Sequence, residues 1–332
     1  MPHTRPAMPR RAALATFAGA LAVPGLSRAQ AAWPDRSVRL VVPFGAGGAS
    51  DTLARTCAQA FTEESGGQTL VVENRGGAGG TIAGAATAQA RPDGYTLMLA
   101  DLGANAIAHE MMRGLAYDPP SAFTPICHLT NLPVVVVVNP TLPVRSAAEW
   151  FAMAKARAAT PLTYAHPGIG YPSQLAHELM LQLTGTRMVP VSYRSGAEVM
   201  RSVISGECDC AIPTVSSALP FIREGKARPI AVLTANRVPQ LPETPPMAQT
   251  LPGFEASVWN GIVGPAGMDA ALVQRINQVF VKIMHRAEVT QRVQTSQAAQ
   301  VVAGTPSEFA TLIRAEIARW TPLIRANNLR AE

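Results

Sequence analysis

Apolar strand segments that end in glycine-rich turns constrain the fold of this chain more than any other feature. The turns span 44–51, 74–81 and 166–173, and a helical pattern follows each of them. Continuously apolar strands separated by helices are typical of βαβ units, in which parallel strands are covered by helices on both faces. The sequence therefore predicts an α/β protein built on parallel sheets.

The hydrophobic periodicity predicts where the individual elements lie. Strands are expected at 37–44, 68–73, 95–100, 134–138, 162–165, 188–193, 208–212, 230–234 and 259–264. Helices are expected at 51–64, 81–90, 147–158, 173–183, 197–205, 218–224, 269–286 and 306–327, with one more ending near 113. Ser50 or Asp51 is expected to cap the first helix, because a side-chain oxygen there can accept an unpaired main-chain N–H.

Two α/β lobes explain this order of elements. The first lobe is expected to take in residues 32–133 and 254–332, and the second residues 134–253. Segments near 131–139 and 252–262 are expected to cross between the lobes. A proline-rich stretch just before the second crossing is expected to be a strap, because proline disrupts helices.

Residues 1–31 are typical of a secretory signal peptide. They contain four arginines, no acidic residue, an apolar run at 12–26 and the cleavage pattern Ala29-Gln30-Ala31. The run is shorter than the roughly 20 residues that span a bilayer, so no membrane insertion is expected. We expect a periplasmic chain that begins near Ala32. General secretion and twin-arginine export both fit, because Arg10-Arg11 is a loose twin-arginine pattern; a buried or disordered N-terminal helix is the alternative.

The charge balance argues against a nucleic-acid partner. The formal net charge of +6 falls to +2 without residues 1–31, which leave 24 basic residues against 22 acidic ones. Aromatic residues make up 5% of the chain, too few for platforms on which bases stack.

The four cysteines, Cys57, Cys127, Cys208 and Cys210, are interpreted as small buried residues. Cys208 and Cys210 alternate on one expected strand, so their parallel side chains are poorly placed to bridge each other. A Cys57–Cys127 disulfide stays an open alternative. No cysteine–histidine grouping has zinc spacing, so no metal is expected.

The glycine-rich turns are the candidate binding site, because ligands of open α/β sheets bind at the carboxyl ends of the strands. The helix N-termini that follow the turns attract anions. Glycine lets a ligand approach the backbone closely. A carboxylate fits this environment, although the glycines of any single turn can also merely end a strand.

The sequence lacks residues that the common catalytic and cofactor-binding motifs require. Ser50 stands where a dinucleotide fingerprint needs its third glycine, and the chain has neither a phosphate loop nor a G-x-S-x-G elbow. His177 lacks the second histidine of a zinc helix and is expected to pack or lie at the surface. His166 lies on a candidate ligand turn. We expect no cofactor and no catalytic residue.

Several segments together resemble the Bug-type substrate-binding receptors of tripartite tricarboxylate transporters. They are VPFGAGGASDTLAR at 42–55, VENRGGAGG at 72–80, RPDGYTL at 91–97 and LPGFEA at 251–256. The resemblance covers essentially the whole mature chain. It implies a type II periplasmic-binding-protein fold, in which two lobes close around a ligand in the cleft between them.

The resemblance also implies a binding site for a small carboxylate, held largely by main-chain amides and ordered water. The matching positions are Phe44, Gly47, Ala49, Ser50, Asp51, Gly80, Thr81, Asn105, His166, Gly168, Gly170, Tyr171, Ser173, Tyr193 and Ser195. Asp51 is expected to cap its helix or bind water, because a carboxylate repels an anion.

Two residues depart from the family pattern. Tyr171 stands near a position where the family has a small Ser or Thr, and it can stack on an aromatic ligand. Pro213 replaces an Asp that the family often has. The ligand is therefore expected to be a di-, tri- or aromatic carboxylate without an ammonium group.

The leading hypothesis is a monomeric, non-enzymatic solute receptor that delivers a carboxylate to the membrane permease subunits of a tripartite tricarboxylate-type transporter. One alternative is a solute sensor that signals through a membrane kinase. The other is an exported hydrolase or isomerase that uses His166 and Asp51, which lacks a complete set of nucleophile, base and orienting residue.

Overall fold

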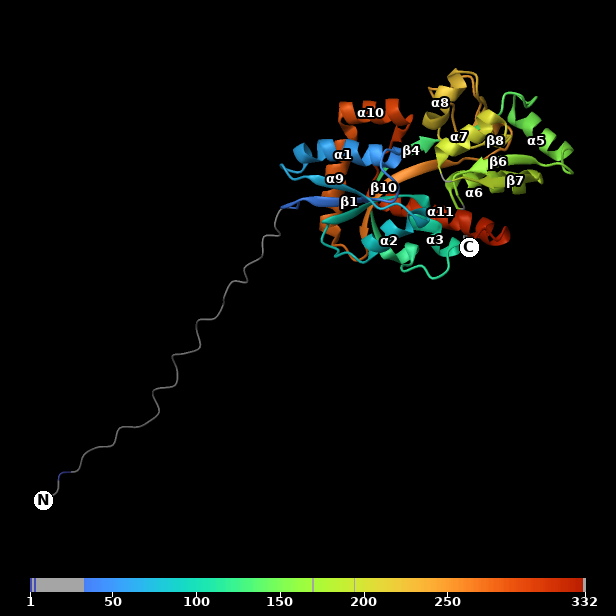
Figure 1. The fold of residues 1–332 in the computed structure, drawn as a ribbon. Coiled ribbons are helices and arrows are strands. Elements are labelled where there is room, and N and C mark those ends of the chain that lie inside the picture. Colours follow the sequence, from blue (N-terminus) through green and yellow to red (C-terminus); the bar gives the residue numbers. More distant parts are fainter. Residues whose placement is uncertain (2, 4–32, 169, 194, 331–332) are drawn as a thin grey trace. The chain divides into compact units, whose positions relative to one another are not determined.

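Two β-sheets organise the part of the chain that the computed structural model describes, namely residues 33–168, 170–193 and 195–330 together with residues 1 and 3 (Figure 1). The expected signal peptide, apart from Met1 and His3, lies outside the described residues. The expected α/β class with two sheets is confirmed.

The first sheet has the strand order β11-β4-β10-β3-β1-β2. Its strands are β1 (Val38–Val42), β2 (Leu70–Asn74), β3 (Thr96–Ala100), β4 (Phe123–Pro133), β10 (Ser257–Pro265) and β11 (Gln300–Val301). β1 pairs in parallel with β2 and β3, whereas β10 runs antiparallel to β3 and β4.

The second sheet has the strand order β7-β6-β8-β5-β9. Its strands are β5 (Val135–Val138), β6 (Leu162–His166), β7 (Met188–Ser192), β8 (Cys210–Ala211) and β9 (Arg228–Val232). β6 is parallel to β7 and β8, but β5 is antiparallel to β8 and β9.

Parallel sheets were expected, but both sheets are mixed, with parallel and antiparallel pairs. β4 runs almost directly into β5, and β10 returns beside β4. These connecting strands therefore run antiparallel to neighbouring strands of the sheets that they join. A buried central strand is apolar on both faces in either direction, and periodicity cannot distinguish the two. β4 and β11 were also not expected.

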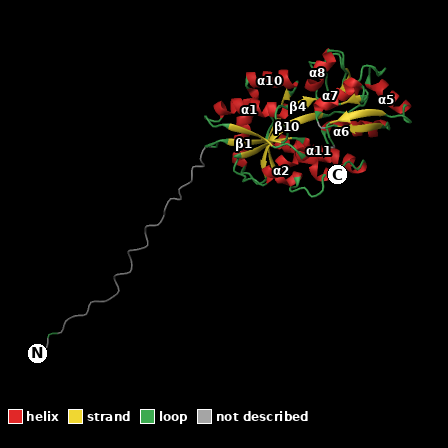
Figure 2. Cartoon of the chain, viewed as in Figure 1, coloured by secondary structure: helices red, strands yellow, loops and turns green. Residues whose placement is uncertain are grey.

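Helices cover both faces of the sheets, as Figure 2 shows in red around the yellow strands. They are α1 (Ala49–Glu64), α2 (Thr81–Ala88), α3 (Ala108–Met111), α4 (Pro119–Ala122), α5 (Ala147–Ala156), α6 (Pro172–Thr184), α7 (Gly196–Ser205), α8 (Val215–Arg223), α9 (Ala270–His285), α10 (Ala287–Gln297) and α11 (Pro306–Ala326). Short turns of 3-10 helix at Ala78–Gly80 and π-helix at Gly103–Ile107 precede α2 and α3.

Each sheet packs a core on both faces. In β1, Leu40 belongs to a cluster with Phe61 and Phe280, whereas the adjacent Val41 faces a cluster with Phe309. This alternation follows from the pleat of a strand. In Figure 1, α1 and α10 lie on one side of the first sheet, and α2, α3 and α11 lie on the other.

The thiols are free and buried at Cys57, Cys127, Cys208 and Cys210. Burial raises the pKa of Cys57 and of Cys127 to about 12, so both are protonated at neutral pH. The interpretation of the cysteines as small buried residues agrees with this, and Cys57 and Cys127 are not bridged.

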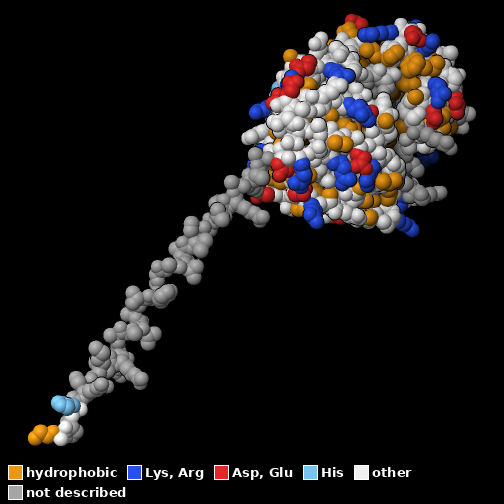
Figure 3. Space-filling model, turned by 60° about the vertical axis from the view of Figure 1, so that its left-hand side comes forward, with side chains coloured by type: hydrophobic (Ala, Val, Ile, Leu, Met, Phe, Trp, Pro, Cys, Tyr) orange, Lys and Arg blue, Asp and Glu red, His pale blue; other side chains and the backbone are white. Residues whose placement is uncertain are grey.

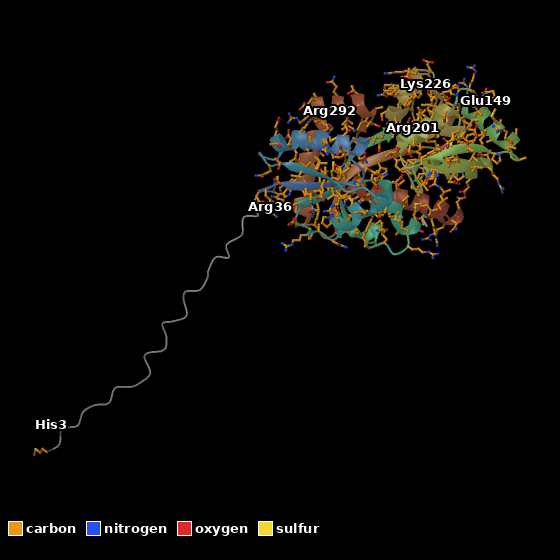
Figure 4. All side chains as sticks on the ribbon, viewed as in Figure 1. His3, Arg36, Glu149, Arg201, Lys226 and Arg292 are labelled. Carbon is orange, nitrogen blue, oxygen red and sulfur yellow. The ribbon has the colours of Figure 1, made fainter. Side chains whose placement is uncertain are left out.

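The surface mixes charges of both signs. On the face in Figure 3, basic and acidic side chains lie interspersed. The five charged residues labelled on the folded part of the chain in Figure 4 are exposed and come from different segments: Arg36, Glu149, Arg201, Lys226 and Arg292. Within the described ranges, no helix has the length and apolar character that a membrane span needs.

Candidate functional site

A small pocket of about 50 Å³ lies where the strands of the second sheet end and the next helices begin. The helices line it with residues from their first turns and N-caps: Tyr171 and Ser173 of α6, Gly196 and Val199 of α7, and Thr214 and Ser217 of α8. Ile212, Pro213 and Val258 add apolar wall. No described charged side chain lines the pocket.

The helix N-termini around this pocket offer main-chain donors. Tyr171 is the N-cap of α6 and Thr214 the N-cap of α8, and neither side chain makes a capping hydrogen bond to a described residue. The first N–H groups of a helix have no intrahelical acceptor and carry the positive end of its dipole. A pocket between such ends, free of acidic side chains, favours an anion.

The glycine turn before α6 is held in a fixed shape. Gly168 and Gly170 have φ of 129° and 78°, values that favour glycine. A ring nitrogen of His166, Nδ1, lies 2.9 Å from the carbonyl oxygen of Gly168, and the N–H of Gly170 donates to Oε1 of Gln174 at 2.7 Å. Burial lowers the pKa of His166, so its ring is neutral at pH 7. His166 therefore supports the turn from beneath, and its contact with a ligand stays a prediction.

A second cluster forms at the carboxyl ends of β1 and β2. The buried carboxylate of Asp51 accepts hydrogen bonds from the N–H of Gly47 at 2.8 Å, from Nδ2 of Asn74 at 3.0 Å and from Nε of Arg55 at 3.0 Å. The hydrogen bond from Arg55 is the main cause that lowers the pKa of Asp51. Nδ2 of Asn74 also donates to the carbonyl of Phe44 at 3.1 Å. These bonds hold the turn that precedes α1.

The expected cap of α1 was wrong. The helix begins at Ala49 with Gly48 as its N-cap, and neither Ser50 nor Asp51 nor any other described side chain caps it. Asp51 lies one turn too late to cap, and its carboxylate reaches back to Gly47 instead. Gly47, Ala49 and Ser50 lie exposed or half-exposed around this helix N-terminus.

The neighbouring turns pack tightly against this one. Gly80 has a φ of 90°, and a Cβ there would lie 3.0 Å from Cβ of Pro43 and 3.3 Å from Cβ of Ala104. The buried Thr81 donates its hydroxyl to the carbonyl of Ala78 at 2.8 Å. Oδ1 of the buried Asn105 accepts from the N–H of Asp101 at 3.0 Å. Gly80, Thr81 and Asn105 thus lie together, but their side-chain contacts hold turns.

The two clusters meet at the N-terminus of α6. A Cβ on Gly170 would lie 2.2 Å from Sδ of Met111, which belongs to α3 beside the first sheet. Leu175 of α6 shares a core cluster with Met111 and Trp259. The turn that shapes the pocket is therefore seated on elements of the first sheet.

Tyr193 and Ser195 are not among the residues that line the pocket, and their binding role stays a prediction. The hydroxyl of Tyr193 lies 3.4 Å from Sγ of Cys208, and Ser195 caps α7 by accepting the N–H of Glu198 at 3.3 Å. Of the residues expected to bind the ligand, Tyr171 and Ser173 line the pocket.

Sequence reasoning missed Thr214 and Ser217, which follow a strand but lack a glycine signal. It also missed Asp101, a carboxyl residue 7% exposed at the end of β3. Its position directly after an apolar strand was the available signal. Desolvation raises the pKa of Asp101 to about 7, and burial followed by the charge of Asp101 raises that of Tyr171 to about 12.

A larger groove of about 290 Å³ lies between α1 and the start of α10. Arg286 in its wall is ion-paired with Glu63 at 2.6 Å and with Glu288 at 2.5 Å. The charge of Arg286 is thus neutralised by neighbouring carboxylates, and none of the expected ligand residues lines the groove. Among the described residues, no His, Cys, Asp and Glu side chains gather in a group that could hold a metal ion.

Comparisons with known proteins agree on one kind of molecule. The family model described as tripartite tricarboxylate transporter family receptor matches residues 53–329. Protein BugT of Bordetella pertussis is 31% identical over 295 residues, which cover 88% of this chain and 90% of BugT.

Solved structures show the same fold. Rpa4515 of R. palustris with adipate is 31% identical with a TM-score of 0.80, and the match covers 90% of this chain and all of that one. MatC from Rhodopseudomonas palustris with bound malate is 30% identical with a TM-score of 0.76, covering 88% of this chain and all of MatC.

Proposed function

Because the chain belongs to the tripartite tricarboxylate transporter receptor family, whose members are periplasmic solute-binding proteins and not enzymes, we propose that it captures a small carboxylate and delivers it to the permease subunits of such a transporter. The expected signal peptide, cleaved near Ala31, would bring it to the periplasm as a monomer.

The observation that carries the proposal is the pocket between the N-termini of α6, α7 and α8, without a described charged side chain in its lining. A carboxylate there can accept several main-chain and hydroxyl hydrogen bonds. The adipate and malate in the two solved relatives support the same ligand class.

Helix dipoles alone cannot supply the binding free energy of the ligand. A helix dipole contributes about 0.3–1 kcal/mol, or up to about 2 kcal/mol in a partly buried site. A micromolar dissociation constant needs about 8 kcal/mol. Hydrogen bonds to a charged group, at about 1.5–3 kcal/mol each, and burial between the two sheets must supply the difference.

The lining narrows the ligand class. Pro213 is apolar and lines the pocket, so it offers no partner to an ammonium group. Tyr171 lines the same pocket and presents a ring that can stack on an aromatic acid. We therefore favour a di-, tri- or aromatic carboxylate without an ammonium group.

An enzymatic role has no support in the contacts of His166 and Asp51. His166 is buried beneath its turn, and three donors already bond the carboxylate of Asp51. Neither side chain is poised as a general base in this arrangement.

A thermal-shift panel on protein that has been unfolded and refolded, to remove carried ligand, tests the proposal. Adipate, malate, citrate and benzoate are compared with adipamide, which matches adipate in length but carries no charge. A ligand at 100 times its dissociation constant stabilises by about 2.7 kcal/mol, or roughly 5–11 °C at 2–4 °C per kcal/mol. The proposal expects such a shift for at least one acid and none for adipamide. Equal shifts for acid and amide, or turnover of the acid, contradict it.

A further inference from the structure

Asp101 is a buried carboxyl group at the carboxyl end of β3, in the first sheet. It follows β3 directly and is 7% exposed. Oδ1 accepts the N–H of Ala104 at 2.8 Å, and the N–H of Asp101 donates to Oδ1 of Asn105 at 3.0 Å. These bonds fix the carboxyl group between the turns of the first sheet.

Glycine turns, and not basic side chains, surround the carboxyl group of Asp101. A Cβ on Gly80 would lie 3.8 Å from Oδ2 of Asp101, and a Cβ on Gly103 would lie 3.6 Å from Oδ1. No described residue forms an ion pair with Asp101, in contrast to Asp51, which has Arg55. A buried carboxylate without a cation is costly, and a bound anion nearby adds repulsion.

The titratable groups that act on Asp101 are phenols. Tyr171 approaches from the N-cap of α6 and Tyr117 from the loop after α3, where its hydroxyl donates to the carbonyl of Ala104 at 2.8 Å. Burial raises the pKa of both tyrosines, so both stay neutral at physiological pH. No described cation enters this cluster to offset the charge of Asp101.

Tyr171 connects this cluster to the pocket. It lines the pocket, and the adjacent Gly170 packs against Met111 of α3, in the segment that follows Asp101. We propose that Asp101 holds a proton when the receptor binds its carboxylate, so that capture of the anion is coupled to uptake of one proton from solvent. This inference rests on the proposed carboxylate-binding function and adds a pH dependence and a recognition residue to it.

The expected size of the coupling follows from linkage. Burial raises the pKa of Asp101 to about 7, and an anion close by raises it further. Above pH 7 the proton must be bound together with the ligand, so the dissociation constant rises with pH, by at most tenfold per pH unit. Below pH 7 it is nearly constant. Simple dicarboxylates are fully ionised above about pH 6.5, and the pKa of His166 lies below its ordinary value, so neither produces this slope.

Isothermal titration of the refolded, full mature protein with adipate and with malate between pH 6.5 and 8.5 tests the inference. Wild type is expected to lose affinity progressively above pH 7, by up to about tenfold per pH unit. Asp101→Asn imitates the protonated side chain, so it is expected to bind at every pH as tightly as wild type does at pH 6.5. Asp118→Asn, the same change at an exposed aspartate, is expected to keep the wild-type slope.

Each outcome separates the inference from the proposed function. Binding without a pH slope in wild type, or a slope that survives in Asp101→Asn, overturns the inference and leaves the function standing. Loss of binding by Asp101→Asn at every pH, with a native circular dichroism spectrum, shows that the charged form is required and also overturns it. No binding of either acid by wild type at any pH contradicts the function and the inference together.

A ligand-free measurement covers the case in which the amide variant binds poorly because it folds poorly. The raised pKa of Asp101 adds stability that is full below about pH 4 and is lost as the pH rises through 7. The melting temperature of Asp101→Asn or Asp101→Ser minus that of wild type is therefore expected to be larger at pH 8.5 than at pH 5. An equal difference at both pH values means that Asp101 does not titrate in this range and overturns the inference.

Discussion

The side chain of Asp51 accepts a hydrogen bond from the main-chain N–H of Gly47, four residues earlier, at 2.8 Å. The carboxylate thus closes the turn before α1 on itself and leaves the N-terminus of that helix without a side-chain cap. Because the carboxylate of Asp51 bonds to Gly47 and does not cap the helix, the first main-chain N–H groups of α1 stay available.

Replacing Asp51 by Asn is expected to destabilise the protein by about 2 kcal/mol, because a buried network of charge-assisted bonds loses its charge. The folded pKa of Asp51 is lowered, so its stabilisation is present above the unfolded value near 4 and is lost as the pH falls below it. Urea unfolding at pH 7 and pH 3 measures this.

The difference between wild type and Asp51→Asn should shrink at pH 3. Asp118→Asn, on the exposed surface, is the matched control and should change stability little. A difference that is equal at both pH values would show that the charge of Asp51 is not what stabilises the turn.

Gly170→Ala is expected to destabilise the protein by more than backbone strain alone. The residue has a φ of 78°, and its new Cβ would fall 2.2 Å from Sδ of Met111. Gly185→Ala is the matched control, because φ there is 62° and no atom lies within 4 Å of the new Cβ. The control should cost about 1 kcal/mol from backbone strain alone.

Shortening Met111 in the Gly170→Ala background removes the clash and should restore part of the stability. A double-mutant cycle by chemical denaturation measures the coupling, which we expect to favour the pair by at least about 1 kcal/mol. Additive effects would mean that the two residues do not meet in solution.

Pro213→Asp is expected to lower the affinity for adipate at least tenfold, because it adds a carboxylate to the pocket wall. The same change should raise the affinity for glutamate relative to adipate, since an ammonium group gains a partner. Competition titrations with wild type, Pro213→Asn and Pro213→Asp check this. If the neutral Asn variant shifts the preference as much as Asp does, shape rather than charge is the cause.

Much of this architecture could be predicted because turns and strand ends carry local signals. The glycines before α1, α2 and α6 lie at the positions expected. Gly168 and Gly80 have positive φ, which favours glycine, so these turns are visible in the sequence. The strands of β1 and β6 follow from their apolar runs, since both faces are buried.

What could not be predicted depends on contacts between distant parts of the chain. The break between α9 and α10 falls at Arg286, which no proline or glycine marks and which pairs with Glu63 and Glu288. Asp101 looks like an ordinary polar residue after a strand, and its raised pKa arises from burial that only the folded chain creates. The lining contributed by Thr214 and Ser217 likewise depends on how α8 meets α6.

The most direct measurement of the central claim is a crystal structure with the carboxylate that shifts the melting temperature most. Carboxylate oxygens are expected within hydrogen-bond distance of main-chain N–H groups in the first turns of α6 and α8, beside Ser173 and Thr214. A carboxylate bound instead to Arg286 or Arg292 in the groove between α1 and α10, with the pocket empty, would contradict it.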